Sequence, residues 1–159
     1  MTREFPGIPE ARPQPISPLT ARRLALFPDT TRIAIRRGDE LLSIAGCYLD
    51  ELANLYGTPL YLYDQATLDS AVFSYRQALA TYPAAAGITY AGKAYLCKAI
   101  AQWVHQNGLK VDCTGAGELA IATAAGVSKE HILVHGVNKT QADLDAALAH
   151  AGILVVDNL

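Results

Sequence analysis

Four short apolar segments recur at an almost constant spacing in the second half of the chain, and this repeat limits the possible folds more than any other feature. The segments read GITYAG, GLKVDC, HILVHG and GILVVD, with their first large apolar residues 21 to 23 positions apart, at Ile88, Leu109, Ile132 and Ile153. That spacing accommodates one strand and one helix. Nearly all-apolar strands that alternate with helices indicate a parallel sheet covered by helices. A closed barrel and an open sheet both satisfy the pattern.

The residues between these strands have the spacing of helices. Apolar residues recur there three or four positions apart, which is typical of a helix with one buried face. They are Leu96, Ile100, Trp103 and Val104; Leu119 and Ala122; and Leu144, Leu148 and Ala151. The first of these helices is expected to open at Lys93. Thr140 and Asp143 fit a capping pair, and glycines stand at the expected helix ends, at positions 108, 126 and 152.

One more strand and helix are predicted before the repeat. Residues 59–64, PLYLYD, read as a buried strand, and Asp64 is placed to cap the helix that follows. Leu68, Val72, Tyr75 and Leu79 would form the apolar face of that helix.

The chain is predicted to have three parts. Residues 1–30 hold six of the eight prolines and are expected to form an extended arm, because proline removes a backbone donor. Residues 31–57 are expected to form two strands around Arg37-Gly38-Asp39 and a short helix that Gly57 stops. Residues 58–159 are expected to form the βα repeat.

Composition and charge exclude several classes of protein. The 159 residues are 51% hydrophobic and 18% charged, with a net charge of -2, which is typical of a globular chain with one core of ordinary size. There is no basic face for nucleic acid, no apolar run near the roughly 18 residues of a membrane span, and no secretory signal pattern. A cytoplasmic protein without nucleic-acid or membrane partners is therefore expected. Cys47, Cys97 and Cys113 include no CxxC pair, so neither disulfides nor a metal site is indicated.

Polar residues follow each of the four predicted strands at its carboxyl end. They are Lys93 after the first strand, Asp112 and Thr114 after the second, His135 and Asn138 after the third, and Asp157 and Asn158 after the fourth. In parallel α/β proteins ligands bind at this edge, whether the sheet is closed or open. The sequence therefore predicts a functional edge.

Lys93 is the most informative of these residues. A lysine at the end of a buried strand costs free energy unless it is paired, neutral or modified, and a desolvated amine suits Schiff-base chemistry. Its neighbours Ala91, Gly92 and Ala94 leave room for a flat cofactor. The alternative is a lysine whose ammonium reaches solvent from the edge, and position alone does not decide between the two.

The other candidates each have two interpretations. Asp112 could pair with Lys93 across adjacent strands, or it could cap the helix that begins near Gly115, which is the role that its spacing favours. His135 could lie against a ligand ring or hydrogen-bond a loop carbonyl. Glu118 fits the preference of helix N-termini for acidic residues.

Five motifs together resemble the diaminopimelate decarboxylases, which are fold type III, alanine-racemase-like pyridoxal-phosphate enzymes. In chain order the motifs are YGTPLYLYD, YAGKA, VDCTGAGEL, HILVHGVNKT and ILVVDNL, and the resemblance spans about Leu41 to Leu159. The fold it implies is α/β: the first half of a parallel (β/α)8 TIM-type barrel, preceded by short strands that belong to a β domain.

The resemblance also assigns roles to residues. It implies that Lys93 holds pyridoxal 5'-phosphate covalently at the end of the first barrel strand, that Asp112 lies near this lysine and cofactor, and that His135 and Asn138 are polar positions of an HGNNK-type motif. Members of the family convert meso-diaminopimelate to L-lysine and CO2, with the cofactor ring as electron sink. No metal is implied. The chain departs from the family pattern at Ala116, where glycine is usual, and at Val137, where asparagine is usual.

Length sets a further expectation. A complete (β/α)8 barrel needs roughly 200 or more residues, so we expect this chain to be a fragment that is inactive alone and exposes apolar surface, from a parent enzyme that is a homodimer. Ornithine, arginine and carboxynorspermidine decarboxylases share the architecture and are alternative assignments. A truncated relative that binds cofactor or a partner without catalysis is the alternative from another class.

Overall fold

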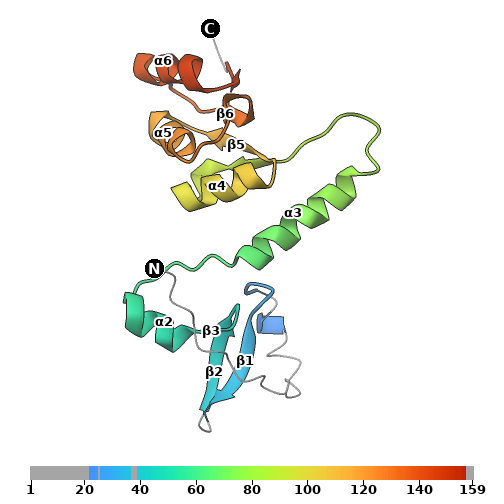
Figure 1. Cartoon of the computed structure of the whole chain (residues 1–159), viewed down its shortest axis with the longest axis vertical. Coiled ribbons are helices and arrows are strands. Elements are labelled where there is room, and N and C mark those ends of the chain that lie inside the picture. Colours follow the sequence, from blue (N-terminus) through green and yellow to red (C-terminus); the bar gives the residue numbers. More distant parts are fainter. Residues whose placement is uncertain (1–21, 25, 37–38, 157–159) are drawn as a thin grey trace. The chain divides into compact units, whose positions relative to one another are not determined.

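The computed structural model describes residues 22–24, 26–36 and 39–156 (Figure 1). The chain divides into two compact units, Met1–Ser74 and Tyr75–Leu159. Most of the predicted arm, the Arg37-Gly38 turn, and the pair Asp157 and Asn158 lie outside the described residues. Within the predicted arm, residues 22–24 are helical rather than extended.

The first unit contains a three-stranded antiparallel sheet. Its elements are β1 (Arg32–Arg36), β2 (Asp39–Ile44), β3 (Cys47–Tyr48) and the helix α2 (Leu49–Tyr56). The predicted hairpin is confirmed, with Arg36 opposite Asp39. The third strand follows a tight turn in which Ala45 and Gly46 both have positive φ. The helix ends as predicted at Gly57, whose φ of 83° favours glycine.

Residues 59–64 do not form the predicted strand. They have no ladder partner in the described part of the chain, and Leu60, Tyr61, Leu62 and Tyr63 are all exposed, Tyr61 by 87%. A strand requires a neighbour that exchanges backbone hydrogen bonds with it, and an apolar composition does not supply one. The prediction of a buried strand was therefore wrong.

The helix α3 (Gln65–Leu79) begins at the predicted cap. Asp64 is buried, and its Oδ1 accepts a hydrogen bond from the backbone N–H of Ala66, while Oδ2 accepts from the hydroxyls of Thr67 and, at 2.7 Å, Thr30. Burial raises the pKa of Asp64, but these hydrogen bonds outweigh it and leave the pKa below its ordinary value of 3.8.

The predicted apolar face of α3 is only partly confirmed. Val72 is the buried residue of this helix, whereas Tyr75 is 64% exposed. Helical spacing shows which residues share a face, but burial also needs an element that packs against that face.

The second unit contains a parallel sheet with helices on one face. Its elements are β4 (Thr89–Ala91), the 3-10 turn η1 (Gly92–Ala94), α4 (Lys98–Gln106), β5 (Lys110–Cys113), α5 (Ala116–Ala124), the 3-10 turn η2 (Lys129–His131), β6 (Ile132–Val134), α6 (Gln141–His150) and β7 (Ile153–Leu154). The strands are ordered β4-β5-β6-β7, and every neighbouring pair is parallel. In Figure 1, α4, α5 and α6 follow one another along the same side of this sheet.

The core of this unit lies between the helices and one face of the sheet. Val111, Cys113, Ile132 and Val134 are at most 1% exposed, and Val104, Leu119, Ala122 and Ala147 cover them from the helices. Burying each large apolar side chain contributes about 1.5–3 kcal/mol. The alternate strand residues, which include Lys110, Asp112 and Leu133, are only half-buried. One face of the sheet is therefore shielded from solvent by the helices, whereas the opposite face is partly accessible to solvent.

This winding decides between the two predicted architectures. In a doubly wound sheet the strand order reverses and helices cover both faces, whereas in a barrel the order follows the chain and all helices lie outside. The strands here follow one another in chain order and the helices cover one face of the sheet, as in a barrel. The prediction of a partial (β/α) barrel preceded by short strands is confirmed.

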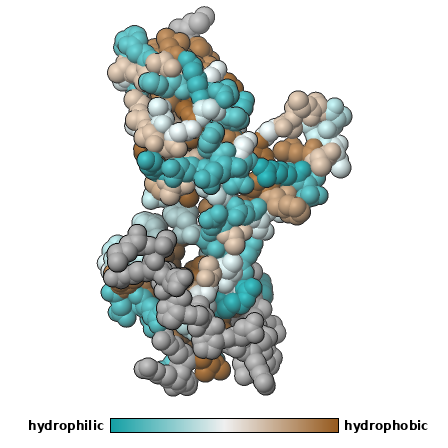
Figure 2. Space-filling view, in the orientation of Figure 1, coloured by the Kyte–Doolittle hydropathy of each residue, from teal (hydrophilic) through white to brown (hydrophobic). Residues whose placement is uncertain are grey.

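Two details of the predicted helices were wrong. Lys93 does not open a helix: it lies in η1, and α4 begins five residues later, at Lys98. Leu148 is 68% exposed, although its spacing placed it on the buried face of α6. Apolar residues also reach the surface elsewhere in this unit (Figure 2). The side chains of Tyr82, Val137 and Val156 are each more than half exposed. No helix of the described residues is long and apolar enough to cross a membrane.

The cap at Asp64 gives the first prediction. We expect Asp64→Ala to lower the free energy of unfolding at pH 7 by about 1 kcal/mol, as other N-cap replacements do, in urea titrations followed by circular dichroism. Because the folded-state pKa is depressed, the carboxylate's contribution is complete above pH 3.8 and is lost as the pH falls through the folded-state pKa. The difference between variant and wild type should shrink accordingly in acid.

Gln65→Ala is the matched control, because Gln65 is the exposed first residue of the same helix. We expect it to change stability by less than about 0.5 kcal/mol. Equal stability of Asp64→Ala and Gln65→Ala at pH 7 would contradict the capping role.

Candidate active site

The predicted polar edge forms at the carboxyl ends of β4, β5 and β6. The parallel register places Ala91 beside Asp112, and Cys113 beside Val134, so that Lys93 and His135 follow strands on either side of β5. Lys93 is exposed in η1, so of the two alternatives that its position left open the structure has the solvent-accessible lysine. It forms no ion pair within 4.0 Å with any residue that the structure describes, although its charge is close enough to lower the pKa of Asp112. The side-chain amine of Lys93 is therefore accessible to solvent at this edge of the sheet.

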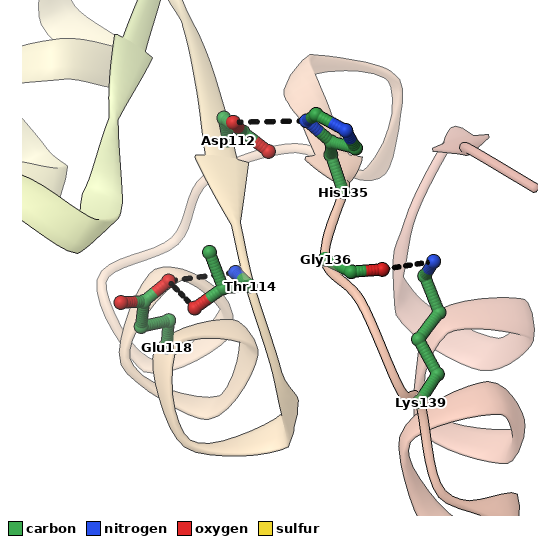
Figure 3. A network of polar contacts seen from close by, with 6 residues as sticks. All are labelled: Asp112, Thr114, Glu118, His135, Gly136 and Lys139. Atoms are coloured by element: carbon green, nitrogen blue, oxygen red, sulfur yellow. Dashed lines mark hydrogen bonds and ion pairs between the residues drawn. The ribbon is translucent and has the colours of Figure 1, made fainter. Parts of the chain in front are cut away.

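Asp112 pairs with His135 rather than capping a helix. His135 Nδ1 lies 3.8 Å from Asp112 Oδ2, across the ends of β5 and β6 (Figure 3). The spacing had favoured a capping role, but Asp112 is still in the ladder of β5, and Gly115 is the N-cap of α5. The first N–H of that helix, on Ala116, is instead bonded by Asp143 Oδ1 at 2.9 Å.

The carboxylate of Asp112 is held in an unusual environment. Burial raises its pKa above the ordinary 3.8; the ring of His135 lowers it, the charge of Glu118 raises it, and that of Lys93 lowers it. Its Oδ1 is buried without a hydrogen-bond partner among the described residues. A buried acceptor of this kind costs free energy until a donor reaches it. The site therefore has a place for a donor beside the open amine.

Glu118 has a stronger local role than its place at a helix N-terminus predicted. Its Oε2 accepts hydrogen bonds from the backbone N–H of Thr114 at 2.7 Å and from the Thr114 hydroxyl at 3.0 Å (Figure 3). Sequence reasoning missed this pair. The signal was the hydroxyl residue followed four positions later by glutamate, one position longer than a capping box.

Two glycines allow the ends of neighbouring strands to approach each other closely. A Cβ on Gly92 would lie 2.7 Å from the carbonyl oxygen of Asp112, and a Cβ on Gly136 would lie 2.6 Å from that of Thr114. No real Cβ approaches backbone so closely. Gly92 was predicted to make room for a cofactor, and the structure adds that it makes room for β5. The role of Gly136 was not predicted.

The loop after β6 is fixed mainly by its backbone. His135 donates its N–H to Cys113 O at 2.9 Å, and Lys139 Nζ donates to Gly136 O (Figure 3). Asn138 has a φ of 56°, a left-handed conformation that asparagine tolerates well. The structure thus gives Asn138 a turn role, and its cofactor contact stays a prediction. Val137 is 86% exposed.

The predicted cap of α6 is confirmed as a full capping box. Thr140 Oγ1 accepts from the Asp143 N–H, and Asp143 Oδ2 accepts from the Thr140 N–H at 3.0 Å. The carboxylate of Asp143 accepts from the Thr140 hydroxyl, from the Ala116 N–H and from the Thr140 N–H, and these hydrogen bonds hold its pKa below the ordinary value of 3.8.

The thiol of Cys113 is not equipped for catalysis. It is fully buried, and burial, with smaller contributions from the charges of Glu118 and Asp112, raises its pKa to about 12. Since the thiolate is the reactive form, Cys113 is a core residue and not a nucleophile.

The residues at the edge fit a pyridoxal group. They supply an accessible primary amine, a carboxylate with one unsatisfied buried oxygen, and an imidazole within reach of that carboxylate. A primary amine is the group that condenses with an aldehyde, and an unsatisfied carboxylate oxygen accepts from a protonated donor. No cluster of three or more metal-ligating side chains occurs among the residues that the structure describes.

Comparison with known proteins agrees with this chemistry. The family model described as "Pyridoxal-dependent decarboxylase, pyridoxal binding domain" matches residues 66–159. The chain is 42% identical over 133 residues to the diaminopimelate decarboxylase of Halalkalibacterium halodurans, covering 83% of this chain and 30% of that protein. The crystal structure of diaminopimelate decarboxylase from M. jannaschii is similar, with a TM-score of 0.71 and 28% identity over 82% of this chain and 30% of that one.

A further solved structure is that of the M. jannaschii diaminopimelate decarboxylase in complex with L-lysine, with a TM-score of 0.68 and 25% identity, again over 82% of this chain and 30% of that one. The chain belongs to the pyridoxal-dependent decarboxylase family, whose cofactor is pyridoxal phosphate. Within that family, the relatives named here are diaminopimelate decarboxylases, and the chain spans about 30% of their length.

The burial of Cys113 gives the second prediction. At pH 8 a thiol of pKa about 12 is ionised to roughly one part in ten thousand, so iodoacetamide should modify the half-buried Cys47 and Cys97 and leave Cys113 intact. Peptide mass mapping of the folded protein measures this. In urea, as the control, all three should react. Modification of Cys113 at the rate of Cys97 in the folded protein would contradict the assigned burial.

Proposed function

We propose that this chain provides the cofactor-binding edge of a pyridoxal-phosphate-dependent decarboxylase that acts on meso-diaminopimelate and releases L-lysine and CO2. The observation that carries the proposal is the placement of the accessible amine of Lys93 at the carboxyl end of β4, next to β5, whose Asp112 pairs with His135 at the end of β6. The choice of substrate is supported by the names of the relatives.

In this proposal each residue at the edge has a distinct task. Lys93 holds the cofactor covalently through its amine, which is exposed and therefore accessible. Asp112 receives a protonated donor at its unsatisfied oxygen and balances positive charge there. His135 keeps the other carboxylate oxygen of Asp112 in place. Asn138 shapes the turn after β6 and borders the same edge.

When bound, pyridoxal phosphate supplies an electron sink for the electron pair that stays on the substrate carbon as the carboxyl group departs as CO2. Asp112 can accept from a cationic donor and balance its charge only when its carboxyl group is ionised. Burial raises its pKa, and the ring of His135 and the ammonium of Lys93 oppose that rise. Once the amine of Lys93 holds the cofactor its ammonium charge is no longer present, so His135 is the neighbour that favours the ionised carboxylate that a cationic donor requires.

The proposal also covers the organisation of the parent enzyme. It assigns residues 58–159 to the first half of a barrel and residues 31–57 to a β domain. Support comes from the separate antiparallel sheet of β1, β2 and β3 and the chain-ordered parallel sheet of β4 to β7. We further propose a cytoplasmic homodimer for the parent, to be checked by light scattering on the protein expressed from its full reading frame.

Covalent labelling tests the role of Lys93. The protein is incubated with pyridoxal phosphate and reduced with borohydride, and the phosphopyridoxyl label is located by peptide mass mapping. Because Lys93 is accessible and follows the strand next to Asp112, we expect it to carry most of the label, and Lys93→Ala to lose that share. Label spread evenly over the lysines, or unchanged in Lys93→Ala, would contradict the proposal.

Activity is tested on the protein expressed from the full reading frame that encodes residues 1–159. With pyridoxal phosphate present, we expect CO2 and L-lysine from meso-diaminopimelate, and a loss of at least roughly a thousandfold in kcat for Lys93→Ala, because the covalent anchor is removed. Lys129→Ala is the control, since Lys129 bonds the carbonyls of Leu148 and Ala149, away from the edge. Turnover of ornithine or arginine in place of diaminopimelate would overturn the substrate assignment.

A further inference from the structure

One carboxylate on α5 is in contact with the turn that carries Lys93. Glu118 Oε2 would lie 3.2 Å from a Cβ on Gly92, the residue directly before Lys93. The same oxygen accepts both hydrogen bonds from Thr114, the residue directly after β5. Glu118 therefore bonds the end of β5 and occupies the space beside Gly92 at the end of β4.

Thr114 is in turn in contact with the end of β6. A Cβ on Gly136 would lie 2.6 Å from the carbonyl oxygen of Thr114, so the backbone at Gly136 rests against Thr114 with no space between them. Gly136 directly follows His135, as Figure 3 shows. Any shift of Thr114 would therefore be transmitted to His135 as well.

These contacts are more than a helix cap. The N-cap of α5 is Gly115, which has no side chain to bond the helix, and the glutamate reaches past it to Thr114. A capping box would end on the N-cap itself. The consequence of the longer reach is that the bond fixes the end of a strand and not only the start of a helix.

We propose that Glu118 is a positioning residue, which sets the places of Lys93 and His135 by holding Thr114 at the centre of the edge. The inference rests on the proposed cofactor role of Lys93. Hydrogen bonding, not charge, is the useful property of Glu118 here, because its negative charge works against the ionised form of Asp112. An amide oxygen at the same place would accept the same two bonds.

The test compares three variants by the labelling share of Lys93. After incubation with pyridoxal phosphate and borohydride reduction, the label at Lys93 is divided by the label at Lys98, an exposed lysine in the same sample. We expect this ratio to fall roughly tenfold in Glu118→Ala, since a displacement of about 1 Å has effects of that order or larger. Glu118→Asp keeps the charge but is too short to reach Thr114, and the ratio should fall similarly. Glu118→Gln should stay within about twofold of wild type.

Thr123→Ala is the matched control, because it removes a hydrogen bond within the same helix, from the Thr123 hydroxyl to the carbonyl of Leu119, at the end of α5 away from Thr114. It should leave the ratio unchanged. If Glu118→Ala does not fold, Glu118→Asp decides alone. An unchanged ratio in Glu118→Asp, or a fall in Glu118→Gln equal to that in Glu118→Ala, would overturn the inference. A wild-type protein without preferential label at Lys93 would instead overturn the proposed function itself.

Discussion

The parallel hydrogen-bonded ladder of β4, β5 and β6 is the interaction on which the polar edge of the sheet depends. Its register aligns Ala91 with Asp112 and Cys113 with Val134, and the segments that follow these strands therefore emerge side by side. Packing supplies the stabilising free energy on one face only, where Val111, Cys113, Ile132 and Val134 lie under the helices. The chemistry is thus separated from the core, since a residue one position along the strand faces the other side.

Within this frame, a few short-range contacts determine how closely the strand ends approach. Gly92 and Gly136 remove the side chains that would keep the neighbouring backbones apart. Glu118 then holds Thr114 between them, and His135 pairs with Asp112. Each contact is modest alone, because a net hydrogen bond contributes about 1 kcal/mol. Their effect is on position: they bring an accessible amine and a partly satisfied carboxylate to the same edge, and the proposed cofactor role requires that proximity.

Features governed by local rules could be predicted from the sequence, and features that depend on tertiary neighbours could not. The antiparallel pairing of β1 with β2, the end of α2 at Gly57, the cap at Asp64 and the Thr140 pair follow from turn and capping preferences, and all were found. The strand at residues 59–64 failed because pairing needs a partner that composition does not reveal. Asp112 was assigned to the wrong contact because sequence spacing cannot show a residue across the sheet. Glu118 and Gly136 were missed for the same reason, since their partners are identified only once the strand ends are in place.

The central claim is that Lys93, Asp112 and His135 form one cofactor edge, and a crystal structure of the protein after treatment with pyridoxal phosphate and borohydride tests it most directly. The account predicts electron density continuous with Lys93 Nζ, with the ring of the cofactor bordered by Asp112 and His135 and a donor within hydrogen-bond distance of Asp112 Oδ1. Continuous density on another lysine, or a cofactor ring that contacts neither Asp112 nor His135, would contradict it.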